Sequence, residues 1–93
     1  MAADEWPTTV DAAVRVLEAM LPDAEKETIA AMPEKDLIML HMRLGQWVRN
    51  NFGLWQDNTM LLRATGKQHP DDASHVIIQA LWQRLQNELP KLH

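Results

Sequence analysis

The sequence predicts an all-α fold, a compact single-domain bundle of four to five helices. Within each segment, the large apolar residues recur at intervals of three and four, as on one face of a helix. Proline, glycine and capping residues separate the segments, and no stretch alternates apolar and polar residues for long enough to form a strand. The 93 residues allow one small domain, which we assign to residues 1–93, with residues 1–8 as a flexible lead and residues 90–93 as a tail.

The first two expected helices occupy the N-terminal third of the chain. Thr8 and Asp11 have the spacing of a capping box, with Asp in place of Glu, and this predicts a first helix over about residues 9–21. Its apolar stripe comprises Val10, Ala13, Val14, Leu17, Met20 and Leu21. Pro22 breaks this helix, and a second, short helix ends before Pro33. Because the second helix has few apolar residues, we expect it to be the most solvent-facing.

Three further helices are expected after the second. The longest apolar stripe predicts a central helix over about residues 34–51, and Gly53 suits the left-handed conformation that ends a helix. Asp57 and Asn58 can cap a brief fourth helix that stops at Gly66. A proline in the first position and two acidic residues in the first turn then open a last helix, which runs over about residues 70–88.

Composition excludes several chemistries. The chain has no cysteine, which excludes disulfides, thiol nucleophiles and zinc sites with cysteine ligands. No apolar run approaches the ~20 residues of a membrane span, and the N-terminus is acidic where a secretory signal would be basic. We therefore expect a cytoplasmic protein without membrane contact. Residues 1–36 hold nine acids and three bases, and residues 37–93 hold four acids and six bases; this distribution argues against a nucleic-acid partner.

One cluster of polar side chains lies between His41 and Trp55. On a helix, His41, Gly45 and Arg49 fall close to one line, so a neighbouring backbone could approach at Gly45 and leave a polar pocket. Alternatively, Gly45 marks a tight helix crossing, His41 is a hydrogen-bonded core residue, and Arg49 with Asn50 binds the free carbonyls at the helix end. The aromatic residues here suit a core or an interface better than a ligand stack: Trp47, Phe52 and Trp55.

A second polar cluster lies at the start of the last helix. Asp71 and His75 are spaced i, i+4, and Asp72 and His75 are spaced i, i+3, so the three side chains share a face that could bind a metal ion. The same carboxylates also favour the positive end of a helix without any metal, and we expect neither a metal nor a cofactor. Ser74 and His75 point about 100° apart on a helix, which suits a nucleophile and its base poorly. We assign no catalytic residue.

The sequence resembles a family of small uncharacterised bacterial domains, a domain of unknown function, in motifs that cover about two thirds of the chain: Glu34-x-Asp36-Leu37, His41-x-x-Leu44-Gly45-x-Trp47-x-Arg49-Asn50, Gly53-Leu54-Trp55 and His69-Pro70-Asp71-Asp72-x-Ser74-x-x-Ile77. The resemblance implies no activity, ligand or partner. It does imply that seven residues form one spatial unit: His41, Arg49, Asn50, Trp55, Asp71, Asp72 and Ser74. We expect an ion pair between Arg49 and Asp71 or Asp72.

The leading functional hypothesis is a non-enzymatic protein-interaction or regulatory module. It would bind another protein or a second copy, a homodimer being the simplest form, through an apolar patch near Trp55, Met60 and the last helix. The alternative is a small-molecule or hydrolytic site in which Arg49 holds an anion and a carboxylate or imidazole moves a proton. Its expected members line one open cleft: His41, Arg49, Asn50, Asp71, Asp72 and His75.

Overall fold

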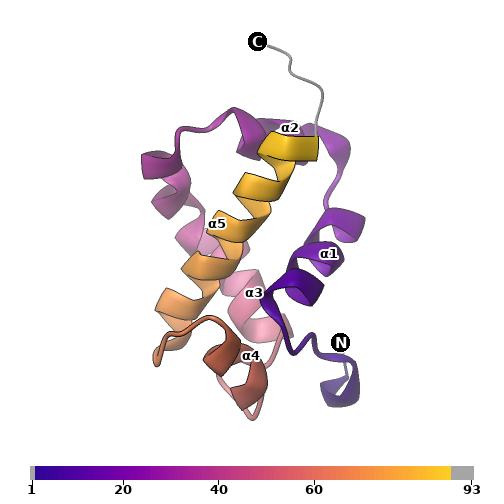
Figure 1. The fold of residues 1–93 in the computed structure, drawn as a ribbon, viewed down its shortest axis with the longest axis vertical. Helices are drawn as coiled ribbons and strands as arrows, with labels where there is room; N and C mark the ends of the chain where they lie inside the picture. The colour runs from indigo at the N-terminus through magenta and orange to yellow at the C-terminus, as the bar shows by residue number, and fades with distance from the viewer. Residues whose placement is uncertain (1, 89–93) are drawn as a thin grey trace.

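The computed structural model describes residues 2–88 and contains five α-helices, with no strand in that range (Figure 1). The prediction of an all-α single-domain bundle is confirmed. The helices are α1 (Val10–Met20), α2 (Asp23–Ala31), α3 (Gln46–Asn51), α4 (Thr59–Ala64) and α5 (Pro70–Glu88). None of the helices in the described range is both long and apolar enough to cross a bilayer. The tail expected at residues 90–93 lies outside the described residues.

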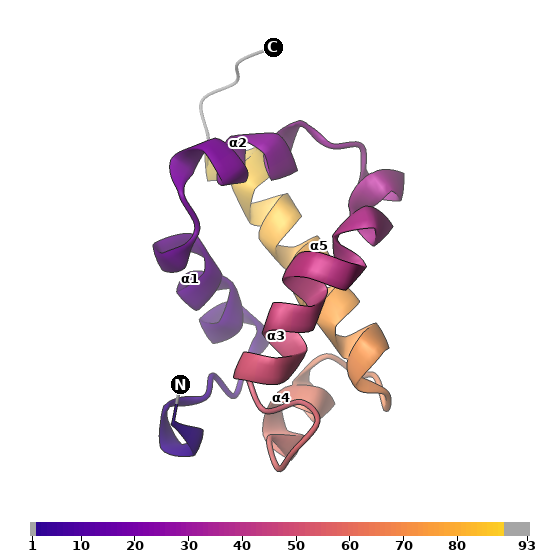
Figure 2. The same cartoon turned by 180° about the vertical axis from the view of Figure 1, so that it is seen from behind.

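Helix α5 runs diagonally across the molecule, with α1 on one side of it, residues 34–45 on the other side, and α2 crossing near its C-terminal end (Figures 1 and 2). It begins where the sequence predicted, with Pro70 in the first position, where a missing N–H costs nothing, and it continues to Glu88, the last residue that the structure describes. Every fourth residue along one face is buried: Ala73, Ile77, Leu81 and Leu85. This stripe meets the apolar faces of α1 and α3, and the burial of these faces against α5 holds the bundle together.

The ends of α1 differ slightly from the prediction. Thr9, not Thr8, is the N-cap, and its hydroxyl accepts a hydrogen bond from the Ala12 N–H at 3.0 Å. The capping-box prediction was therefore one residue out of register, and Asp11 does not return a bond to the cap. Met20 was expected in the buried stripe but is 42% exposed.

The expected helix over residues 34–51 is wrong as a single regular α-helix. Residues Glu34–Leu40 form a 3₁₀ helix, His41–Gly45 form a turn of π-helix, and only then does α3 begin. Arg49 reaches back to this stretch and donates a hydrogen bond to the carbonyl of His41, in the turn of π-helix. Gly45 leaves room for it, since a Cβ there would lie 2.9 Å from the Arg49 Nη1. Gly45 thus accommodates a side chain rather than the neighbouring backbone that we expected.

The residues predicted to end or cap helices adopt the expected conformations. Gly53 and Gly66 both adopt positive φ, at 71° and 75°, as expected for the left-handed ends of helices. Asn58 caps α4 by accepting the Leu61 N–H through its side-chain oxygen. These three positions were predictable because glycine at a helix end and an N-cap side chain both act on the few residues next to them in the chain.

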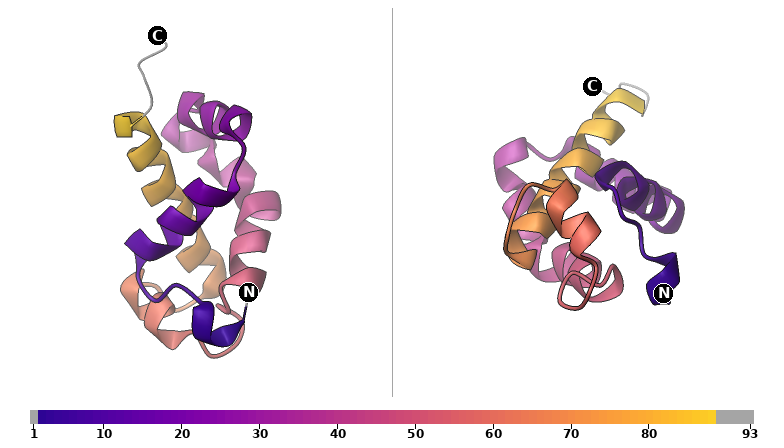
Figure 3. Two further views of the ribbon diagram at one scale, coloured as in Figure 1. Left: turned by 90° about the vertical axis from the view of Figure 1, so that its right-hand side faces the viewer. Right: turned by 60° about the horizontal axis from the view of Figure 1, so that its bottom comes forward.

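The segment expected as a flexible lead is partly packed onto the bundle. The buried amide of Asn58 donates to the carbonyl of Pro7 at 2.8 Å and to that of Phe52 at 2.6 Å. Trp6 lies so close to Gly53 that a Cβ there would be 2.5 Å from the indole ring. The N-terminal segment therefore lies against the end of the molecule that carries α4 (Figure 3).

Candidate functional site

Arg49 is the centre of a buried polar network between α3 and α5. Its side chain is only 7% exposed, and its guanidinium has a partner in each of three directions. Nη1 donates to Oγ of Ser74 at 2.9 Å, Nη2 donates to the carbonyl of His41 at 3.2 Å, and Nε lies 3.4 Å from Oδ1 of Asp71. The predicted ion pair between Arg49 and Asp71 is thereby confirmed.

Ser74 and His41 complete this network. Ser74 is fully buried, and its hydroxyl donates to the backbone carbonyl of Asp71 at 2.9 Å while it accepts from Arg49. His41 Nδ1 lies 3.5 Å from the Arg49 Nη1; because arginine can only donate, this nitrogen is the acceptor and carries no proton. No buried side-chain polar atom in residues 2–88 lacks a partner. The network therefore satisfies itself and fixes residues 41–49 against α5.

His69 and Trp55 hold the start of α5. His69 Nδ1 accepts the backbone N–H of Asp71 at 3.1 Å, and it also lies 3.9 Å from Oδ2 of the same residue. The two contacts need opposite protonation states of Nδ1, and the shorter, directional hydrogen bond describes this arrangement. Trp55 packs edge-on against the His69 ring, with centroids 5.6 Å apart at 86°. Trp55 is 54% exposed, so of the two expected locations, core or interface, it does not lie in the core, and its place in an interface stays a prediction.

A groove of about 300 Å³ lies beside this network, and we call it the polar groove. Its lining comprises Ile38, His41, Lys67, Asp71, Asp72, His75, Val76 and Gln79. Four of the six side chains that we expected to share one cleft line the polar groove. Arg49 does not line it, because it is buried against Ser74 and its other partners, and neither does Asn50, which is exposed. Arg49 is therefore not available to an anionic ligand. Within residues 2–88, no group of three or more acidic or histidine side chains could hold a metal ion.

Exposed apolar side chains gather on residues 34–45, the 3₁₀ and π-helical stretch that Arg49 contacts. We call this stretch the irregular segment. Ile38, Met39 and Met42 are 60%, 70% and 71% exposed and lie within five residues of one another in the chain. We call these three residues the ridge. One signal pointed to the ridge: all three lie off the apolar stripe of this segment.

A second groove, of about 400 Å³, is lined by residues from the end of α1, from α2 and from residues 40–47. We call it the apolar groove. Most of its lining is apolar: Met20, Leu21, Ile29, Leu40, Leu44 and Trp47, with Glu25, Thr28 and Arg43 as the polar members. Glu25 belongs to α2 and Arg43 to the irregular segment, so the two exposed charges stand on opposite walls.

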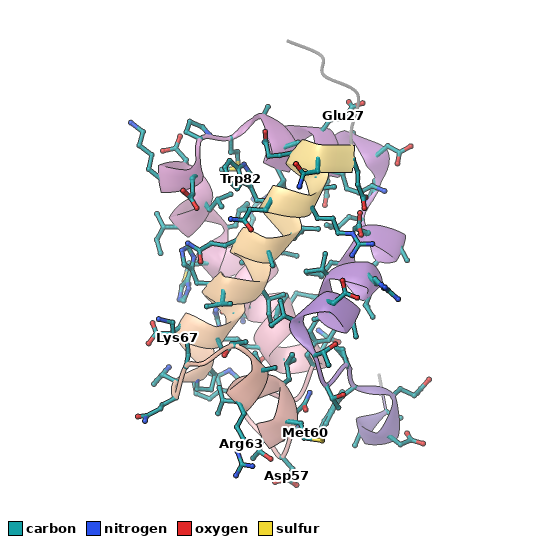
Figure 4. The ribbon with its side chains drawn as sticks, in the orientation of Figure 1. Glu27, Asp57, Met60, Arg63, Lys67 and Trp82 are labelled. Atoms are coloured by element: carbon teal, nitrogen blue, oxygen red, sulfur yellow. The ribbon has the colours of Figure 1, made fainter. Side chains whose placement is uncertain are left out.

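The residues of the expected apolar patch, Trp55 and Met60, do not belong to the ridge. Met60 is 64% exposed on α4, at the opposite end of the molecule from Trp82 and α2 (Figure 4). Trp55 has one edge covered by His69. Both residues are exposed, and their part in an interface stays a prediction.

A charged cluster joins α1 to α5 and was not anticipated. Arg84 lies 2.9 Å from Asp11, 2.7 Å from Glu18 and 2.9 Å from Glu88. Burial raises the pKa of Glu18, and the adjacent Glu88 raises it further. The hydrogen bond to Glu18 lowers the pKa of Glu88, and the hydrogen bond to Glu88 raises the pKa of Arg84. The one-heptad spacing of Asp11 and Glu18 was the available signal that both share a face of α1.

A family model described as a domain of unknown function (DUF6794) matches residues 6–85. No curated protein matches the chain. No solved structure matches it either.

Proposed function

The chain belongs to the family described as a domain of unknown function (DUF6794), and from that premise we propose that it is a non-enzymatic protein-interaction module. The observation that carries the proposal is the ridge. Ile38, Met39 and Met42 are all at least 60% exposed and lie within five residues of one another. Methionine adapts its shape to partner surfaces at little cost, and exposed apolar side chains that adjoin one another favour a binding surface over plain solvent contact.

The ridge offers enough apolar area to drive a modest association. Full burial of one such side chain contributes about 1.5–3 kcal/mol, and these residues still have about two thirds of that area to bury. The gross contribution is therefore roughly 3–6 kcal/mol for the three residues together. The cost of association consumes part of this gain, so we expect a partner to contact more than the ridge alone.

In this proposal, the buried polar network positions the ridge. Arg49 binds the carbonyl of His41, which lies between Met39 and Met42 in the chain, and it anchors that point to Ser74 on α5. Side chains that satisfy one another in this way lock a backbone conformation. The expected site residues His41, Arg49, Asp71 and Ser74 thus serve binding indirectly, by fixing the irregular segment. The resemblance and the cysteine-free composition favour a bacterial cytoplasm as the setting.

Affinity capture from native cell extract tests the proposal. The double variant Met39→Gln, Met42→Gln is compared with the wild type, and Met60→Gln is the matched control because its methionine is also exposed but lies at the other end of the molecule. We expect a stoichiometric protein, either a second copy or another chain, to be retained by the wild type and the control and lost from the double variant. Equal recovery on all three, with folding verified by circular dichroism, would contradict the proposal.

The polar groove supports a second candidate function, the binding of a small cation. Asp72 is exposed and has no ion-pair partner within residues 2–88, and it shares the groove with Asp71, His41 and His75. Asp71 is already paired with Arg49, so the carboxylate of Asp72 is the group that would attract a cationic ligand, in competition with Lys67 on the same groove. Calorimetric titration with a short diamine would detect binding that Asp72→Asn abolishes. Heats that are the same for both proteins would exclude this candidate.

A further inference from the structure

We propose that the partner of the ridge is a second copy of this chain, and that each copy inserts its ridge into the apolar groove of the other. The inference rests on the proposed function and goes beyond it by naming the partner and the surface. The ridge and the apolar groove adjoin one another on the same irregular segment. Both surfaces are apolar: the ridge consists of exposed side chains, and the apolar groove is a hollow that could receive them.

The order of residues along the segment makes this surface complementary to itself. Met39 and Met42 project into solvent, while Leu40 and Leu44, which alternate with them along the chain, line the apolar groove. A two-fold axis pairs every patch of a protein with the same patch on its partner, so a stable contact requires that one patch contain both the projecting and the receiving part. A patch that contains both a ridge and a groove meets this requirement. A single two-fold axis then places the ridge of each copy in the apolar groove of the other.

The charges at the groove are complementary under the same operation. Arg43 stands at the boundary between the ridge and the apolar groove, and Glu25 stands on the far wall. Neither side chain forms an ion pair within the part of the chain that the structure describes. A ridge that enters the partner's groove carries its Arg43 toward Glu25 of the partner subunit, and the symmetry makes this pair twice.

Other occupants fit these features less well. An anionic lipid surface would face the acidic side chains of α2, of which Asp23, Glu25 and Glu27 are exposed, and the repulsion opposes docking. A foreign amphipathic helix would fill the apolar groove but leave the ridge exposed to solvent. Only a second copy buries the ridge and fills the groove together.

Sedimentation equilibrium over a range of protein concentrations tests the dimer. We expect the apparent mass to rise from 10.7 kDa toward twice that value, and Met39→Gln, Met42→Gln to weaken the association at least about tenfold. Met60→Gln is the control and should dimerise as the wild type does. A wild type that remains monomeric up to about millimolar concentration overturns the inference. The proposed function then stands if another captured protein depends on the ridge, and falls if none does.

A charge reversal tests the geometry of the dimer. Arg43→Glu and Glu25→Arg should each weaken the dimer by about tenfold or less, as expected for pairs at the rim of an interface, and the double variant should restore it. Both residues are exposed, so each variant is expected to fold. A dimer that is weakened by neither change, or that the double variant fails to restore, would place the contact elsewhere and overturn the ridge-in-groove arrangement.

Discussion

Replacement of Arg49 by methionine should destabilise the domain strongly. Methionine keeps much of the side-chain volume but loses the hydrogen bonds to Ser74 Oγ and to the carbonyl of His41. Each lost bond to a buried partner costs about 1–1.5 kcal/mol, and more where an acceptor stays unsatisfied. The pair with Asp71 adds less than about 1 kcal/mol, because that carboxylate is 43% exposed and screened by solvent. The sum is about 2–4 kcal/mol.

This loss is large for a chain of this size. A domain of 93 residues has a total stability of about 5–14 kcal/mol, so the expected fall in melting temperature is on the order of 10–30 °C. Urea denaturation followed by circular dichroism, at a protein concentration low enough to keep the chain monomeric, measures the change. Arg63→Met is the matched control, because Arg63 is exposed on α4, and it should change stability by no more than about 0.5 kcal/mol. Equal midpoints for the two variants would refute the assigned role of the network.

Two further predictions concern stability. Because burial and the nearby Glu88 raise the pKa of Glu18, folding favours its neutral form; that contribution is present at low pH and is lost as the pH rises from the ordinary value of 4.5 through the raised value. We therefore expect Glu18→Gln to raise the urea midpoint at pH 7 and to change it little at pH 4; a lowered midpoint at pH 7 would contradict this. Gly53→Ala and Gly66→Ala share the cost of positive φ, about 1 kcal/mol, but only Gly53 has Trp6 in the way. Gly53→Ala should therefore cost about 1–2 kcal/mol more than Gly66→Ala, and equal losses in thermal melts would show that Trp6 does not pack there.

The parts of the fold that follow from local chemistry were predictable from the sequence. Pro70 opens a helix, Asn58 caps one, and Gly53 ends one, because each effect depends on a few neighbouring residues. The Arg49–Asp71 pair was predictable for another reason: two motifs that recur together in a family tend to touch, and one charge of each sign was present.

The parts that depend on tertiary contact were not predictable. The stripe over residues 34–51 has a helical period, yet its first part forms a 3₁₀ helix and a turn of π-helix, which the periodicity of apolar residues does not distinguish from an α-helix. The exposure of Met39 and Met42 also depends on what packs beside them, and an apolar residue type alone does not tell burial from exposure. The position of the three ridge residues off the apolar stripe was a signal in the sequence, but only the structure shows that their side chains are exposed.

The most direct test of the central claim is nuclear magnetic resonance of the protein labelled at its methionine methyl groups. The claim is that Met39 and Met42 enter the interface while Met60 does not. On dilution from about millimolar to low micromolar protein, the methyl signals of Met39, Met42 and the groove residue Met20 should shift together with one dissociation constant, and that of Met60 should stay fixed. Concentration-dependent shifts confined to Met60, or no shift at Met39 and Met42, would contradict the account.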